Sequence, residues 1–148
     1  MHDAVVVATP DGILVTDKAA SSQLKQYVPH YRPMYEKRQW GEYKVLDFRI
    51  SDHGESYLTK ELTVFPGKNL SYQRHQHRSE IWTFVSGEGL LVLNGIIKKV
   101  SRGDMAYIYP DMLHGLKAAT ELHLIEVQVG SELTEEDIER FDYAWDKV

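Results

Sequence analysis

Histidines, a glutamine and a glutamate crowd one short segment of the chain. Gln73, His75 and His77 alternate along it, and Glu80 follows three residues later. A β-strand turns alternate side chains to one face, so the first three converge if the strand is regular, and a turn or bulge just before Glu80 brings it to the same side. His114 lies much further along the chain, at the end of another expected strand. Imidazole, carboxylate and amide donors together are typical of a site for Zn²⁺, Mn²⁺, Fe²⁺ or a similar divalent ion.

Not every histidine fits such a site. His53 stands next to Gly54 in a polar loop, and His123 lies inside an apolar run, so both are interpreted as structural. The alternative for the whole cluster is a set of solvated turn residues. That alternative suits a single histidine better than it suits several donors at compatible positions.

One lysine shares a strand face with apolar residues. In the run 57–64, strand parity groups Lys60 with Leu58, Leu62 and Val64. A lysine on an apolar face costs free energy unless it is paired or functional. Lys60 therefore either points into the interior or is an edge-strand lysine whose amine reaches water. The same parity gives a second mixed face, made of Leu122, Leu124, Glu126 and Gln128.

The composition excludes several classes of protein. The chain has 148 residues with 22 Asp and Glu against 17 Lys and Arg, a net charge of −5. This length predicts one main domain, and the acidic balance disfavours a nucleic-acid binder, which needs a basic face. The absence of cysteine excludes disulfides and thiolate sites. No apolar run approaches the ~18 residues of a membrane span and no signal-peptide pattern is present, so we expect a cytoplasmic protein without a membrane partner.

Short β-type runs separated by turn residues fill the middle of the chain. Asn94-Gly95 between two apolar runs is the strongest of the hairpin signals. Many short strands at near-regular spacing are typical of a sandwich or a barrel. The expected strands are 43–48, 57–65, 70–75, 81–85, 90–93, 96–100, 105–109 and 122–129.

The two ends of the chain differ from this body. At the start we expect two short strands, 4–8 and 13–15, joined by a turn and followed by a helix over 19–27, before Pro29 and Pro33 mark a linker. At the other end the pattern predicts a helix over 134–145. Its signals are a capping Thr134, an acidic first turn and one face formed by Ile138, Phe141 and Trp145.

The body resembles the cupin superfamily. Its first motif is matched by Pro66-Gly67, Gln73-x-His75-x-His77-x-x-Glu80 and Gly87, and its second by Gly103-Asp104, Pro110 and His114. More narrowly, the stretch is similar to type II mannose-6-phosphate isomerases. That similarity rests on Arg32-Pro33, Trp40-Gly41-x-Tyr43, Thr63-Val64-x-Pro66-Gly67, Leu70-Ser71, Arg78-x-Glu80-x-Trp82, Val85-Ser86-Gly87, Glu126-Val127-Gln128-x-Gly130 and Glu136-Asp137-Ile138-x-Arg140.

The resemblance implies an all-β, RmlC-like jelly-roll barrel with one divalent metal ion in its lumen and the C-terminal helix packed on it. Cupin spacing implies the metal ligands Gln73, His75, Glu80 and His114. His77 then lies beside the metal or the substrate. Asp111 stands where the family usually has Gly, so the loop that carries the last histidine is expected to differ in shape.

The first residues resemble a different domain. The segment 5–18 is similar to the tail of the nucleotidyltransferase domain of mannose-1-phosphate guanylyltransferases, in whose bifunctional members that domain precedes an isomerase cupin. We therefore divide the chain into a remnant, 1–30, and a cupin domain, 31–148. No phosphate-cradling Gly-rich loop is present, so guanylyl transfer is not expected. The chain is either a fragment or a stand-alone cupin that kept the tail.

The resemblance implies interconversion of mannose 6-phosphate and fructose 6-phosphate, a proton transfer between adjacent carbons. A metal would stabilise the developing charge on the sugar oxygens, and a base must take the proton. Lys60, His77 and Glu126 are the candidate bases, with Arg140 also assigned to the catalytic set. The expected substrate contacts are Arg78, Lys60, Gln128 and Arg140.

Two other functions compete with this one. The first is a sugar-phosphate or sugar-nucleotide binding cupin without turnover, associated with a separate guanylyltransferase. The second is another cupin activity such as dioxygenation, because one fold hosts many chemistries. In each case the partner is a small molecule, and the exposed sheet edges of the barrel favour a homodimer.

Overall fold

The computed structural model describes residues 3–9, 11–26 and 32–147. The chain divides into two compact units, Met1–Glu36 and Lys37–Val148. This division lies a few residues beyond the predicted boundary at residue 30. The origin of the first unit as a remnant of another domain stays a prediction.

The first unit contains the two expected strands. β1 (Ala4–Thr9) pairs antiparallel with β2 (Gly12–Asp17). The α-helix predicted over 19–27 is wrong, because the chain forms only the short 3₁₀-helix η1 (Ser21–Gln26), and Tyr27 lies outside the described residues. This segment begins with two serines, which are weak helix formers, and has no acidic residue in its first turn. So short a segment gains too few hydrogen bonds to offset the cost of starting an α-helix.

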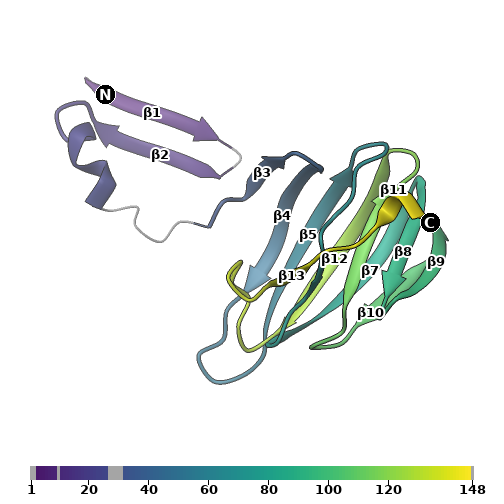
Figure 1. Cartoon of the computed structure of the whole chain (residues 1–148). Coiled ribbons are helices and arrows are strands. Elements are labelled where there is room, and N and C mark those ends of the chain that lie inside the picture. Colours follow the sequence, from purple (N-terminus) through teal and green to yellow (C-terminus); the bar gives the residue numbers. More distant parts are fainter. Residues whose placement is uncertain (1–2, 10, 27–31, 148) are drawn as a thin grey trace. The chain divides into compact units, whose positions relative to one another are not determined.

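The rest of the structure consists of strands in two antiparallel sheets (Figure 1). The strands are β3 (Tyr35–Arg38), β4 (Gly41–Arg49), β5 (Ser56–Val64), β6 (Tyr72–Arg74), β7 (Arg78–Ser86), β8 (Glu88–Leu93), β9 (Ile96–Ser101), β10 (Met105–Ile108), β11 (His114–Ala118), β12 (Leu122–Gly130) and β13 (Glu139–Phe141). One sheet has the order β10-β7-β12-β5-β4-β3 and the other β13-β6-β11-β8-β9. The all-β prediction is confirmed. Within the described residues there is no α-helix, and no helix is long and apolar enough to cross a membrane.

The helix predicted over 134–145 is wrong. The segment instead forms the strand β13, and the 3₁₀-helix η2 (Trp145–Lys147) follows it. β13 pairs with β6, and Asp137 accepts hydrogen bonds from a turn some sixty residues earlier in the chain. These tertiary contacts outweigh the helical pattern, because a lone helix of this length is marginal in water.

The sequence patterns did not predict two further strands, β11 and β3. β11 begins at His114, whereas the prediction placed this histidine at the end of a strand. Gly115 interrupts the apolar pattern of that five-residue strand. β3 carries charged residues at three of its four positions, so its composition does not favour a strand.

Side-chain alternation in the three central strands builds the interior. Buried positions recur at every second residue of β5, β7 and β12, and Lys60 lies on the buried face of β5 as strand parity predicts. Hydrogen-bonded register aligns these positions into rows across the sheet. The row Leu62–Leu124–Phe84 is apolar, whereas the next rows are Lys60–Glu126–Trp82 and Leu58–Gln128–Glu80. One end of the interior is therefore a hydrophobic core, and the other end carries polar groups.

The hairpin predicted at Asn94-Gly95 is confirmed. These two residues join β8 to β9 and have φ values of 47° and 81°. A two-residue loop of this kind needs left-handed backbone at both positions, which asparagine and glycine tolerate best. The hairpin fixes the register of the edge strand β9 against β8.

Gly130 is the last residue of β12, and it lies against the turn between β6 and β7. A Cβ atom at this position would overlap the carbonyl oxygen of His77, and it would crowd the Cα atom of Arg78. Glycine is therefore required for close backbone approach. This approach presses β12 against the turn that carries the candidate metal ligands.

We expect Gly130→Ala to lower the free energy of unfolding by about 3 kcal/mol, because the added methyl group forces the backbone apart. Denaturant unfolding measures this change. Gly54→Ala is the matched control, since its methyl group would meet only the side chain of Ser51. Equal stability of the two variants would show that the turn yields without cost.

Candidate metal centre and cavity

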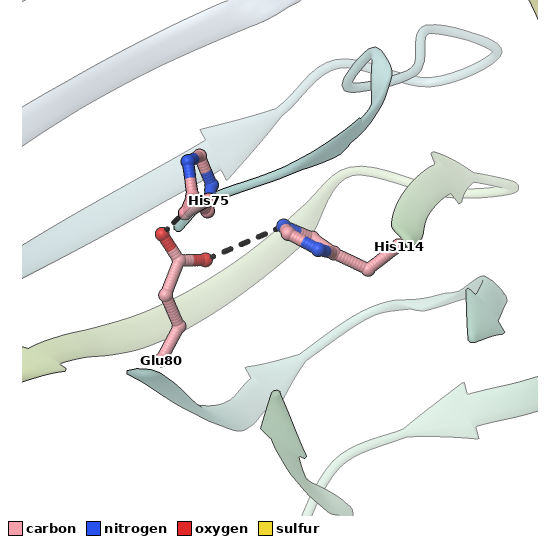
Figure 2. Close-up of side chains that lie close together, drawn as sticks. All are labelled: His75, Glu80 and His114. Carbon is pink, nitrogen blue, oxygen red and sulfur yellow. Dashed lines mark ion pairs between the residues drawn. The ribbon is translucent and has the colours of Figure 1, made fainter. Parts of the chain in front are cut away.

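Two histidines meet a buried glutamate inside the second unit (Figure 2). His75 Nε2 lies 3.2 Å from Glu80 Oε1, and His114 Nε2 lies 3.6 Å from Glu80 Oε2. The exposed fraction of each of these three residues is 2% or less. Their donor atoms all lie within 4.8 Å of one another, which is the spread expected of ligands around one ion.

The turn between β6 and β7 places two of these groups. β6 ends at Arg74, the chain bends at Gln76 and His77, and β7 begins at Arg78. The bend therefore comes earlier than the position predicted just before Glu80. His75 precedes the bend, and Glu80 lies on the inward face of β7.

Backbone carbonyls set the tautomers of both imidazoles. His75 Nδ1 lies 2.5 Å from the carbonyl oxygen of Asp137, and His114 Nδ1 lies 2.9 Å from that of Met112. A carbonyl accepts hydrogen bonds, so each Nδ1 carries the proton and each Nε2 presents a lone pair toward Glu80. This is the arrangement that metal-binding histidines have in proteins.

His114 Nε2 supplies an independent indication that the cluster fits a cation. It is buried and has no hydrogen-bond partner among the described residues. A buried polar atom without a partner is costly. A cation held jointly with Glu80 and His75 would satisfy this atom, so the donor set fits a divalent metal ion.

His75 is neutral at physiological pH. Burial and the nearby Arg78 guanidinium lower its pKa to about 4. Its contact with Glu80 is therefore between a neutral imidazole and a carboxylate. A neutral imidazole can bind a metal ion without first losing a proton.

A cavity of about 590 Å³ adjoins the cluster. It is lined by cations and carboxylates from several strands, and Glu80 connects it to the histidines. The predicted residues that line it are Lys60, Gln73, Arg78, Glu80, Glu126, Gln128 and Arg140. The structure therefore gathers residues from across the chain into a single polar hollow.

Comparison with known proteins agrees with this geometry. The family model described as the mannose-6-phosphate isomerase C-terminal domain matches residues 22–143. The chain belongs to this family. The mannose-1-phosphate guanylyltransferase ManC of Salmonella typhimurium is 36% identical, with coverage of 100% of this chain and 32% of the relative. A mannose-1-phosphate guanylyltransferase of Escherichia coli is 35% identical, with the same coverage. The chain spans about a third of the length of these curated relatives.

A solved structure identifies the fold. An RmlC-like cupin from Shewanella frigidimarina superposes with a TM-score of 0.58 at 22% identity, covering 69% of this chain and 86% of that protein. The predicted cupin fold is confirmed by this likeness. The chain is therefore a cupin. Polar residues of the two interior rows described above line its cavity.

Gln73 stands beside the cluster in this cupin. Its Nε2 atom lies 3.4 Å from His75 Nε2, and its Oε1 atom lies 2.5 Å from the Ser71 hydroxyl. Rotation about the last side-chain bond exchanges the amide oxygen and nitrogen, because the two groups have nearly the same shape. Gln73 is thus in place to offer an oxygen as a fourth donor.

Arg78 lies inside the cluster. Its exposed fraction is 6%, Nε donates to Glu80 Oε1 at 3.0 Å, and Nη1 donates to the carbonyl oxygen of Thr134. Nη2 lies 3.2 Å from His75 Nε2. The guanidinium therefore contacts two of the candidate ligand groups, and its charge compensates the buried carboxylate.

Glu126 has the environment of a proton-transfer group. Burial raises its pKa above the ordinary value, and the neighbouring Glu80 carboxylate raises it further. Gln128 donates a hydrogen bond to Glu126 Oε1 at 2.5 Å, and Lys60 is its register partner on β5. Carboxyl groups held in this way are common among general bases.

Two predicted residues occupy different surroundings from those expected. His77 is half exposed, lies 3.9 Å from Glu132 and lines a separate hollow of about 220 Å³. The bend after β6 breaks strand parity, and the structure does not bring His77 into the cavity. Arg140 lines the cavity, but from β13 and not from a helix.

Asp111 adopts the backbone conformation that glycine favours. Its φ is 64°, and its N–H donates to the carbonyl oxygen of His75 at 2.7 Å. Aspartate tolerates left-handed backbone better than most residues. Asp111 therefore takes up a tight turn that glycine would also form, and the predicted difference in loop shape from the family stays a prediction.

Several cavity residues were missed from the sequence. Arg38, Tyr43 and Glu135 line the same cavity. Lys60 Nζ lies 4.4 Å from the centre of the Tyr43 ring and 2.8 Å from Glu135 Oε1. Parity could have assigned Tyr43 to the buried face of β4. No sequence signal identifies Glu135, because it lies in the irregular segment 131–138.

We expect His114→Ala to lose a bound divalent ion. The protein would be stripped with a chelator, reloaded and analysed for metal content. Addition of the ion should also stabilise the original protein, by about 2.7 kcal/mol at a hundred times Kd, and this gain should vanish in the variant.

His123→Ala is the matched control, because its ring contacts Thr63 and Glu121 and lies on the face of β12 opposite the buried one. Full metal occupancy in His114→Ala would remove this histidine from the ligand set. Loss of the ion in His123→Ala would point to a different site.

Proposed function

We propose that this chain interconverts mannose 6-phosphate and fructose 6-phosphate, with one divalent ion held by Gln73, His75, Glu80 and His114. The observation that carries the proposal is the buried Nε2 atom of His114, which has no hydrogen-bond partner among the described residues and faces Glu80. Glu80 in turn lines a cavity that holds both cations and a carboxyl group of raised pKa. Family membership supports the choice of substrate.

Glu126 is the proposed base. It takes a proton from the sugar carbon next to the carbonyl group and returns it to the former carbonyl carbon, while the hydroxyl proton of the first carbon passes to the former carbonyl oxygen. A base works best when its pKa is near the working pH, and burial moves the pKa of Glu126 in that direction. Gln128 orients the carboxylate by its hydrogen bond, and His77 lies outside the cavity that holds the substrate in this scheme.

Cationic side chains hold the phosphate in this proposal. Lys60 and Arg140 line the cavity, and Arg78 reaches it from the cluster. A phosphate monoester accepts several charge-assisted hydrogen bonds at once. The bound metal ion would supply Lewis-acid polarisation of the sugar oxygens.

The second candidate function is binding of a sugar phosphate without turnover. The observation that favours it is the name of the relatives, which are guanylyltransferases about three times as long as this chain. A non-catalytic cupin of this kind would keep the cations but would not need Glu126. An isomerase assay on the purified, metal-loaded chain distinguishes the two candidates.

We expect Lys60→Met to raise KM for mannose 6-phosphate by about 10- to 100-fold with little change in kcat, because a charge-assisted contact with the phosphate is lost. Methionine keeps the volume of the buried stem, so the melting temperature should change little. Steady-state kinetics tests this expectation.

Lys99→Met serves as the control, since Lys99 is exposed on β9. If Lys60→Met lowers kcat and leaves KM unchanged, Lys60 takes part in proton transfer and not in phosphate binding. Unchanged kinetics would exclude both roles.

We expect Glu126→Gln to lower kcat by about 10²- to 10⁴-fold. In the original protein kcat/KM should rise with pH as Glu126 loses its proton, and this rise should lie above the ordinary carboxyl pKa of 4.5 because the pKa is raised. The rise should disappear in the variant.

Glu61→Gln is the control, because Glu61 is an exposed neighbour of the same kind on β5. Retention of the pH-dependent limb in Glu126→Gln would transfer the role of base to another group.

A further inference from the structure

The contact between Lys60 and Glu135 joins a buried group to an exposed one. The Lys60 side chain is 7% exposed, the Glu135 side chain is 58% exposed, and the two atoms lie 2.8 Å apart. Lys60 belongs to the interior face of β5, whereas Glu135 belongs to the segment 131–138 between β12 and β13. The buried cation is thus partly neutralised by a carboxylate that remains in contact with solvent.

The backbone on either side of Glu135 is anchored independently of this contact. Leu133 is 5% exposed, and the carbonyl oxygen of Thr134 accepts a hydrogen bond from Arg78. On the other side, the Asp137 carboxylate accepts hydrogen bonds from the backbone N–H groups of Gln76 and His77. Although burial raises the pKa of Asp137, these two donors lower it overall. The Glu135 side chain can therefore leave Lys60 while the segment stays in place.

The position of the Glu135 carboxylate is one that an anionic ligand would use. The carboxylate contacts the ammonium group of Lys60 at the wall of the cavity. Arg140 lines the same cavity. A phosphate group has three acceptor oxygens and more charge than a carboxylate, so it competes well for such a cation. Within the protein, the ion pair contributes only modestly, because one of its partners is exposed to solvent.

Building on the proposed function, we propose that Glu135 is a tethered anion that occupies the phosphate position at Lys60 and is displaced when a sugar phosphate binds. Glu135 keeps the buried lysine compensated before substrate arrives. It also lowers the affinity of Lys60 for any added anion, because that anion must first break the Lys60–Glu135 contact.

The test measures binding of inorganic phosphate to the metal-loaded protein by titration calorimetry. Glu135→Gln should tighten phosphate binding by up to about fivefold, because the competing charge is gone while the side-chain size is kept. Glu135→Asp should behave in the same direction, since its shorter side chain does not reach Lys60. Glu136→Gln is the matched control, because the neighbouring Glu136 lines the separate hollow beside His77.

The double variant Lys60→Met with Glu135→Gln shows whether the tighter phosphate binding depends on Lys60. The tightening should vanish in a Lys60→Met background if it acts through Lys60, which is the logic of a double-mutant cycle. Unchanged or weaker phosphate binding in Glu135→Gln, with a normal melting temperature, would overturn the inference, and so would tightening that persists without Lys60.

Binding of phosphate does not require turnover, so this test is separate from the isomerase assay. Tightening in Glu135→Gln together with absent isomerase activity would support the inference and reject the proposed reaction. Isomerase activity together with unchanged phosphate binding would reject the inference alone.

Discussion

The burial of Glu80 is the constraint on which the site depends. The residue is 1% exposed, and a carboxylate in such surroundings is stable only with donors or cations around it. Arg78 and Trp82, its neighbours two residues away on the same face of β7, both donate hydrogen bonds to it. The two histidines face it with the lone pairs of their Nε2 atoms, so a cation shared by the three groups would complete the compensation. Because alternate residues of β7 share one face, the strand that buries Glu80 also carries Arg78 and Trp82, which stabilise its carboxylate.

The three central strands divide the interior into two zones. Register aligns leucines and a phenylalanine in the row that forms the core, and it aligns charged and amide groups in the rows that form the cavity wall. Each strand contributes to both zones, so the hydrophobic burial that stabilises the sheet also holds the polar side chains at fixed spacing. Stability and function therefore rest on the same backbone.

Strand parity made the inward positions of Lys60, Glu126 and Gln128 predictable, because alternation is a local property of the sequence. The cupin motifs also identified the residues of the cluster. The predictions from the sequence were wrong where regular strand geometry ends. His77 leaves the predicted face because the chain bends beside it, and the segment with Glu135 and Asp137 looks helical until its partners on β5 and the β6–β7 turn are known. Those contacts span some sixty residues or more, and no local pattern records them.

The hydrogen bonds from His75 and His114 to main-chain oxygens have an evolutionary consequence. The atom that selects each tautomer is a peptide carbonyl, and every amino acid supplies one. The side chain of Met112 can therefore change without altering which imidazole nitrogen holds the proton. Many metal-binding histidines are oriented by a carboxylate, and a single mutation can remove that partner. In this barrel the orientation of the two imidazoles is encoded in the path of the chain, so neighbouring side chains can change while both Nε2 atoms keep facing Glu80.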